Sequence, residues 1–79
     1  MTHIGHLIKE ELRRQRRPAA WLAKQLCYER GNIYKIFEKP SLDTTLLLRI
    51  SIILRYNFFE IISRLEEKHI LFEEEETEV

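Results

Sequence analysis

The stretch that decides the fold runs from Pro18 to Glu38 and reads PAAWLAKQLCYERGNIYKIFE. Its apolar residues recur at helical spacing in two groups, which predicts two short helices at about residues 18–26 and 30–38. Residues 27–29 form a tight turn between them. The inner faces of the two helices are Leu22, Ala23 and Leu26, followed by Ile33, Ile36 and Phe37. Because Ala23 is small, the two helices can cross closely, and the other side of the second helix must point outward.

The outward side of the second helix carries residue types that contact DNA. Arginine pairs with guanine, asparagine with adenine, and lysine with guanine or phosphate. Tyrosine donates to phosphate or stacks on a base. Together with the tight turn, this is the layout of a helix-turn-helix, whose second helix enters the major groove of double-stranded DNA. The candidate contacts on this helix are Arg30, Gly31, Asn32, Tyr34 and Lys35.

Outward from this stretch, the same spacing predicts three more helices, at about residues 3–15, 44–55 and 58–67. Pro18 and Lys39-Pro40 bound the central pair, Asp43 or Thr44 can cap the fourth helix, and Asn57 leads the fifth. The expected fold class is therefore all-α, a five-helix bundle around one core. The inner faces of the three added helices are Ile4, Leu7, Ile8 and Leu12; Leu47, Ile50, Ser51 and Leu54; and Phe58, Phe59, Ile62 and Leu65.

Length and composition limit the classes of protein to consider. A chain of 79 residues with 44% hydrophobic and 33% charged residues is typical of one small soluble domain. No apolar run reaches the roughly 18 residues that span a bilayer, the first residues carry charges where a signal peptide is apolar, and the single Cys27 cannot form an internal disulfide. We therefore expect a cytoplasmic protein that does not enter membranes.

Charge divides the chain into two unequal parts. Residues 1–65 carry twelve Lys and Arg against six acidic residues, whereas residues 66–79 carry one Lys against seven Glu. Residues 1–68 are expected to form the domain, and residues 69–79 an apolar patch (HILF) followed by a disordered acidic tail. A basic domain favours an anionic partner. The tail either keeps the protein in solution or competes with DNA for the basic face.

Beyond these patterns, the sequence resembles the Cro and phage-repressor-like helix-turn-helix family, also called the xenobiotic-response-element family. The resemblance covers about residues 4–60, with WLAKQL, then NIYKIF, then DTTLLLRIS as its main stretches. It implies a five-helix fold, operator binding and frequent dimerisation. It also implies base contacts from Arg30, Gly31 and Lys35, and base or backbone contacts from Asn32 and Tyr34. The residues that carry it are Leu22, Ala23, Leu26, Arg30, Ile33, Lys35 and Ile36, with Ile8 and Leu12 before them and Pro40 to Leu54 after them.

Three positions depart from the family pattern. Cys27 stands where the turn usually has glycine, so a non-glycine residue is expected to adopt positive φ there. Glu29 replaces the usual Ser or Thr cap of the recognition helix, and Ala19 replaces a glutamine that binds phosphate. Phosphate contacts are then expected from other cations: Arg16, Arg17, Lys24 and Lys39.

The fourth helix is unusually apolar, which indicates an interface in addition to a core. Besides its inner face it carries Leu46, Leu48, Ile52 and Ile53. The sequence therefore predicts a homodimer through the fourth and fifth helices, and a wider internal core is the alternative. The candidate interface residues are Ile52, Ile53, Phe59, Ile70 and Phe72.

Other residues leave alternatives open or exclude functions. Trp21 either packs beside the core or stacks on DNA, and Cys27 is either a small buried hydrophobe or a redox sensor. His3 and His6, with Glu10 one turn on, form either a metal site or solvent-exposed surface. The carboxylates are expected on solvated faces or in the tail, and no catalytic constellation, cofactor or small-molecule site is evident, so we do not expect an enzyme. The competing hypothesis is a protein-interaction module, such as an antitoxin-like protein that neutralises its partner.

Overall fold

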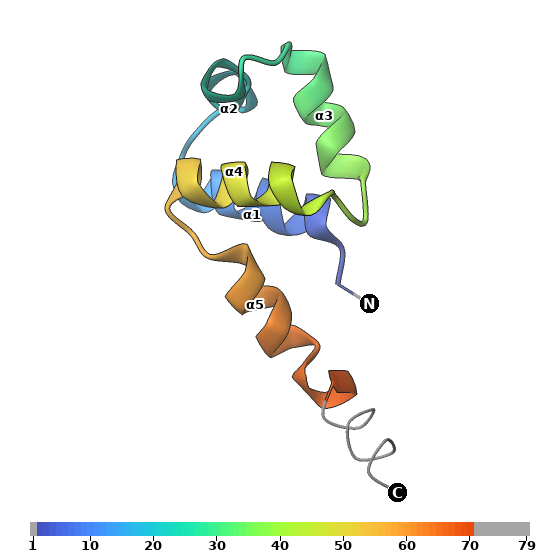
Figure 1. Ribbon diagram of the computed structural model, residues 1–79. Coiled ribbons are helices and arrows are strands. Elements are labelled where there is room, and N and C mark those ends of the chain that lie inside the picture. The colour runs from blue at the N-terminus through green and yellow to red at the C-terminus, as the bar shows by residue number, and fades with distance from the viewer. Residues whose placement is uncertain (1, 71–79) are drawn as a thin grey trace, which may run out of the picture.

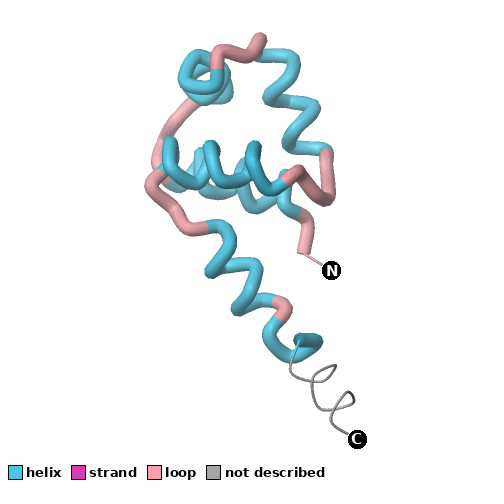
Figure 2. The backbone as a smooth tube through the Cα atoms, viewed as in Figure 1, coloured by secondary structure: helices cyan, strands magenta, loops and turns pink. Residues whose placement is uncertain are grey.

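Five helices form where the sequence predicts them in the computed structural model, which describes residues 2–70 (Figure 1). They are α1 (Ile4–Arg14), α2 (Ala19–Leu26), α3 (Arg30–Glu38), α4 (Thr44–Leu54) and α5 (Phe58–Leu65). Residues 67–70 add one more helical turn, and residues 2–70 contain no strand (Figure 2). The all-α fold class is therefore confirmed. The fifth helix is shorter than predicted, because a turn at Glu66 separates it from residues 67–70.

Side chains cap the starts of three helices. The Asp43 carboxylate accepts from the Leu46 amide at 2.8 Å, and the Asn57 side chain accepts from the Glu60 amide at 3.2 Å. His3 does the same for α1, where its Nδ1 accepts from the His6 amide at 3.1 Å. Each cap satisfies an amide that has no partner within the helix. Of the two candidates for the cap of α4, Asp43 and Thr44, the structure shows Asp43, and Asn57 leads α5 as expected.

Three helix ends require a left-handed residue, and none of the three residues is glycine. Arg16, Cys27 and Arg55 have φ of 57°, 59° and 51° and follow the ends of α1, α2 and α4. This conformation turns the chain sharply and lets amides just beyond the helix bond its last carbonyls. The positive φ predicted for Cys27 is confirmed.

The core takes at least one fully buried side chain from every helix. Leu12, Leu26, Ile36, Leu47 and Leu54 extend it, each at most 6% exposed. The side chains with no exposed surface are Ile8, Leu22, Ile33, Ile50 and Phe58, one from each of α1 to α5.

Gly5 lets α1 lie against the end of α3. A Cβ on Gly5 would collide with the carbonyl groups of Ile36 and Phe37, so no larger residue fits without a backbone shift. The amides of Ile4 and Gly5 donate to the carbonyls of Pro40 and Lys39, both at 2.9 Å. The start of α1 is therefore joined to the connection between α3 and α4.

The fifth helix projects from the body formed by α1 to α4 (Figure 1). Phe58 is its only fully buried residue, while Phe59 is 37% and Leu65 56% exposed. Phe59 and Leu65 therefore do not belong to an inner face, contrary to the sequence prediction, because α5 turns Phe58 and, in part, Ile62 toward the body. Near its far end, Glu66 accepts from the Thr2 hydroxyl at 2.7 Å and the Thr2 amide at 3.2 Å, and these hydrogen bonds lower the pKa of Glu66.

Candidate nucleic-acid interface

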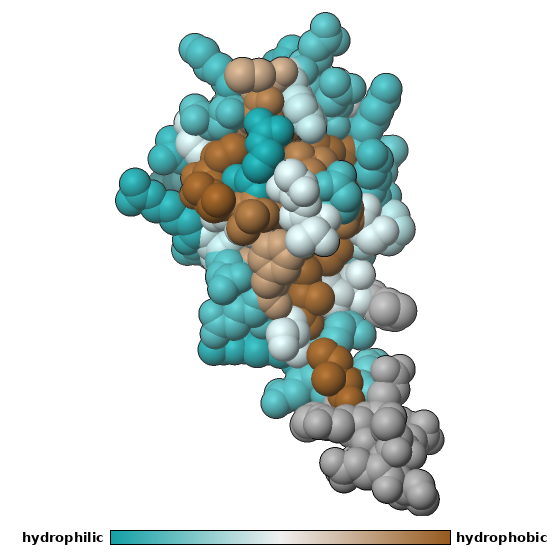
Figure 3. Space-filling view, viewed as in Figure 1, coloured by the Kyte–Doolittle hydropathy of each residue, from teal (hydrophilic) through white to brown (hydrophobic). Residues whose placement is uncertain are grey.

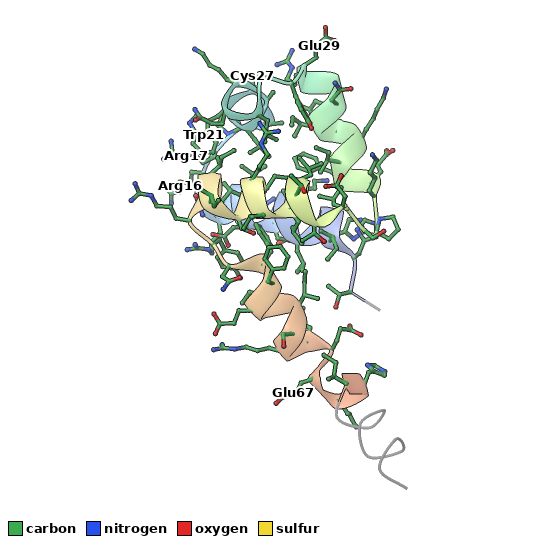
Figure 4. The ribbon with its side chains drawn as sticks, in the orientation of Figure 1. Arg16, Arg17, Trp21, Cys27, Glu29 and Glu67 are labelled. Atoms are coloured by element: carbon green, nitrogen blue, oxygen red, sulfur yellow. The ribbon has the colours of Figure 1, made fainter. Side chains whose placement is uncertain are left out.

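The connection between α2 and α3 is a tight turn that begins at the left-handed Cys27. The Tyr28 amide donates to the Ala23 carbonyl at 2.8 Å, and the Cys27 amide donates to the Lys24 carbonyl at 3.3 Å. Cys27 is exposed, so the expectation of a small buried hydrophobe is wrong. Its left-handed backbone caps the end of α2, where Figure 4 labels the residue.

The third helix is divided into a buried and an exposed side. Ile33, Ile36 and Phe37 are at most 9% exposed and hold the helix against the core. Tyr34 is 54% exposed, and its ring meets the edge of Phe37 with 5.9 Å between ring centroids. All five residues predicted as DNA contacts on this helix are exposed: Arg30, Gly31, Asn32, Tyr34 and Lys35.

Glu29 occupies the N-cap position of α3, as the sequence indicates. Its side chain makes no capping hydrogen bond and is exposed. A carboxylate here interacts favourably with the helix dipole. It also places one negative charge beside Arg30, which is the first residue of the helix.

The predicted phosphate contacts lie on three separate elements. Arg16 and Arg17 belong to the connection between α1 and α2, Lys24 to α2, and Lys39 to the end of α3, and all four are exposed. The Arg17 guanidinium carbon lies 4.3 Å from the centroid of the Trp21 ring, and Figure 4 shows the two side chains next to each other. Trp21 is half-buried and packs against the core, as one of the two interpretations of this residue predicts.

Cations dominate residues 16–39. This range contains six Lys and Arg against two Glu, and all eight side chains are exposed. Three arginines of α1 and α5 are partly neutralised, since Arg13, Arg14 and Arg64 pair with Glu10, Glu11 and Glu60. Within residues 2–70, none of the six cations has a carboxylate within 4.0 Å: Arg16, Arg17, Lys24, Arg30, Lys35 and Lys39.

Arg49 is a further cation beside this surface that sequence reasoning missed. Its guanidinium donates to the Leu26 carbonyl, the last of α2, at 3.5 Å. It comes from α4, which lies against α2 in the fold. No local pattern in the sequence shows that these two helices meet.

A second surface, made by α4 and α5, is apolar. Figure 3 shows hydrophobic side chains over α4 that continue along α5. A groove of about 380 Å³ lies between the end of α4 and the start of α5. Ser51 is 8% exposed and its hydroxyl has no hydrogen-bond partner among residues 2–70. The residues that line the groove are Leu48, Ser51, Ile52, Arg55, Tyr56, Asn57 and Phe59.

The predicted dimer residues fall into three groups. Ile52 is 67% exposed, Phe59 37% and Ile70 51%, so these three are available to a partner. Ile53 instead packs partly against the core, which agrees with the alternative of a wider core at that position. Phe72 lies outside the described residues.

Glu11 contradicts the expectation that the carboxylates are solvated, because it is only 4% exposed. Arg14 contacts both of its oxygens, and Gln15 donates to one of them at 2.6 Å. The Arg14 hydrogen bond, reinforced by that of Gln15, lowers the pKa of Glu11 against the opposing effect of burial. Gln15 also donates to the Leu54 carbonyl at 2.9 Å, so the network joins the ends of α1 and α4 and is structural.

Other kinds of site find no support in the described part of the chain. His3 and His6 stack on each other at 3.6 Å between ring centroids, and residues 2–70 contain no cluster of three side chains able to hold a metal ion. None of the helices described is long and apolar enough to cross a bilayer. Comparison with known proteins adds no neighbour: no family model, no curated protein and no solved structure matches this chain.

Proposed function

We propose that this protein is a sequence-specific, double-stranded DNA-binding regulator of the Cro and phage-repressor type. The observation that carries the proposal is the group of six exposed cations between Arg16 and Lys39, none of which pairs with a carboxylate within residues 2–70. Exposed, unpaired cations favour a polyanion, because binding releases the counterions of the phosphates. In this proposal α2 and α3 form a helix-turn-helix.

The third helix would read the bases. Its buried side fixes its orientation, and its exposed side carries Arg30, Asn32, Tyr34 and Lys35. Arg30 reads guanine and Asn32 adenine through two hydrogen bonds each, while Tyr34 and Lys35 contact a base or a phosphate. Arg16, Arg17, Lys24 and Lys39 contribute phosphate contacts that set affinity without reading sequence.

A homodimer would place two such helices on one duplex. The exposed Ile52, Phe59 and Ile70 support an interface through α4, α5 and residues 67–70. Two recognition helices about 34 Å apart would read a palindrome in successive major grooves. An operator-bound dimer in the cytoplasm would repress transcription by blocking polymerase.

Selection of DNA targets from a random duplex pool tests the proposal. We expect an enriched palindrome whose binding weakens steeply between about 50 and 200 mM salt. Arg30→Ala should weaken binding by about 1–3 kcal/mol and relax specificity at one base. Arg13→Ala is the matched control, because it removes the same charge from α1 outside the proposed surface. Failure to enrich any sequence, together with salt-independent binding, would reject the proposal.

The dimer has its own test. Light scattering at micromolar concentration should give the mass of two chains, and Ile52→Asp should give the mass of one. Thr45→Asp is the control, since Thr45 is an exposed residue of α4 outside the groove. A single-chain mass for the unmodified protein would reject the dimer.

The groove between α4 and α5 supports a second candidate function, a protein-interaction module of the antitoxin type. Leu48, Ile52 and Phe59 expose apolar surface around it. Such a module would bind a partner protein through the groove, and its α3 would not bind DNA. Arg30→Ala separates the two functions, because it should weaken DNA binding by a regulator and should leave partner binding by an interaction module unchanged.

A further inference from the structure

The cations of the proposed DNA surface differ in how firmly they are held. Arg17 is the one that lies on an aromatic ring, with its guanidinium carbon 4.3 Å from the Trp21 centroid. This is well inside the roughly 6 Å limit for an attractive cation–π contact. A guanidinium stacked on a ring keeps its N–H edge available to a planar or tetrahedral anion. Arg16, its neighbour in sequence, has no such contact within residues 2–70.

Hydrogen bonds fix the backbone of both Arg17 and Trp21. The Arg17 amide donates to the Leu12 carbonyl at 2.9 Å, directly after the left-handed Arg16. The Trp21 amide donates to the Pro18 carbonyl at 3.0 Å, and the neighbouring Leu22 has no exposed surface. The ring and the start of the arginine side chain are therefore set by the ends of two packed helices.

We propose that Trp21 is a positioning residue that holds Arg17 ready to bind a backbone phosphate of duplex DNA. The proposal rests on the proposed function, and it assigns a role in DNA binding to Trp21, which lies outside the base-reading helix α3. A free arginine loses rotamer freedom when it binds, whereas a stacked one has already lost part of it. Arg17 precedes α2 and is not part of α3, so its contact is assigned to phosphate, which carries no sequence information.

Substitutions of Arg17 and Arg13 by lysine give the sharpest test. Lysine keeps the charge but cannot stack as a planar group, so Arg17→Lys should weaken binding of a short duplex of arbitrary sequence by about 2–5-fold. Arg13→Lys is the matched control and should bind like the unmodified protein, because Arg13 is an exposed arginine of α1 outside the proposed surface. Affinity is measured by the anisotropy of a labelled duplex, and thermal unfolding followed by circular dichroism verifies that each variant is folded.

Substitutions of Trp21 test the other half of the stack. Trp21→Leu should weaken duplex binding by about 2–5-fold, and Trp21→Phe should retain most of the affinity because the ring face remains. Arg17→Ala should lower the slope of log affinity against log salt by about 0.9, the share of one phosphate. Adding Trp21→Leu to Arg17→Ala should cause no further loss, since the indole acts only through the arginine.

Trp21 is the single tryptophan of the chain, so its emission reports on this site alone. Duplex titration should change the emission of the unmodified protein and of Arg13→Ala, and should change it less in Arg17→Ala. Equal binding by Arg17→Lys and Arg13→Lys, or an equal loss from Trp21→Leu with and without Arg17, would overturn the proposal while leaving DNA binding intact. Tighter binding of a polyglutamate peptide than of the duplex would assign the stack to an acidic protein. If the unmodified protein bound no duplex, the proposed function would fail as well.

Discussion

The third and fifth helices are nearly equal in length, yet they use their apolar residues in opposite ways. In α3, Ile33, Ile36 and Phe37 are all buried, and the rest of the helix is polar and exposed. In α5 only Phe58 is buried, while Phe59 and Leu65 face solvent. An apolar side that is fully covered leaves the other side free to meet a polar ligand. An apolar side left uncovered favours a further protein surface.

The largest expected effect is a difference in the free energy of unfolding between an apolar substitution in α3 and one in α5. Ile33→Ala should lower the free energy of unfolding by about 3 kcal/mol, because the side chain is fully buried and leaves a cavity. Leu65→Ala should cost less than about 0.5 kcal/mol, because Leu65 is 56% exposed. Urea unfolding at low protein concentration measures both. A large cost for Leu65→Ala that grows with concentration would show that a second chain covers α5.

The two glycines give the next contrast. Gly5→Ala should destabilise the fold by about 1–3 kcal/mol, since its Cβ would meet the backbone at the end of α3. Gly31→Ala, within α3, should stabilise it by about 0.5–1 kcal/mol, because nothing lies within 4 Å of the added carbon. Thermal unfolding of both variants tests this. A stable Gly5→Ala would mean that α1 is not seated against α3 as described.

Acid should weaken the polar network that joins the ends of α1 and α4. The pKa of Glu11 is lower in the folded protein than its ordinary value of 4.5, so its stabilisation is complete above that pH and is lost as pH falls through the folded pKa. Glu11→Gln should therefore cost about 1–2 kcal/mol near pH 7 and much less at strongly acidic pH. Urea unfolding across this pH range measures the difference. A cost independent of pH would show that the charge of Glu11 does not matter.

The smallest expected effect concerns the turn that leads into α3. Cys27→Gly should stabilise the protein by about 0.5–1 kcal/mol relative to Cys27→Ala, because glycine adopts φ of 59° without steric cost. Alanine is the appropriate reference, since both variants remove the thiol. Equal stability of the two, measured by thermal unfolding, would mean that the turn relaxes out of the left-handed conformation.

Local patterns predict the helices well because the formation and the ends of each helix depend on residues that are close in sequence. The caps at Asp43 and Asn57 and the left-handed Cys27 depend on neighbours within four positions. The buried Glu11 and the exposed Leu65 depend instead on how distant helices meet. Glu11 is covered where the ends of α1 and α4 come together, and Leu65 is exposed because α5 turns other residues toward the body.

In the candidate site, too, some features follow from local sequence and others depend on contacts between distant residues. The exposure of Arg30, Asn32, Tyr34 and Lys35 follows from the helical spacing of Ile33 and Ile36, which the sequence displays. The Arg17–Trp21 stack is recognisable only afterwards, because Arg17 lies outside any helix and its direction is set by the turn at Arg16. The contact of Arg49 with the end of α2 joins residues 23 positions apart. Such tertiary contacts have no local signal.

The hydrogen bonds that join α1 to the connection after α3 also determine when α1 can pack during synthesis. The amides of Ile4 and Gly5 find their acceptors on Pro40 and Lys39, and the cleft that Gly5 opens is closed by the backbone of Ile36 and Phe37. At about 5–20 residues per second, a ribosome needs roughly 2–7 s to make the chain between these partners. During that interval α1 has no surface to pack on, so it remains an isolated amphipathic segment until α3 is complete. The first helix to be made therefore completes its packing only after the third, and a chaperone that binds apolar helices has its opportunity in those seconds.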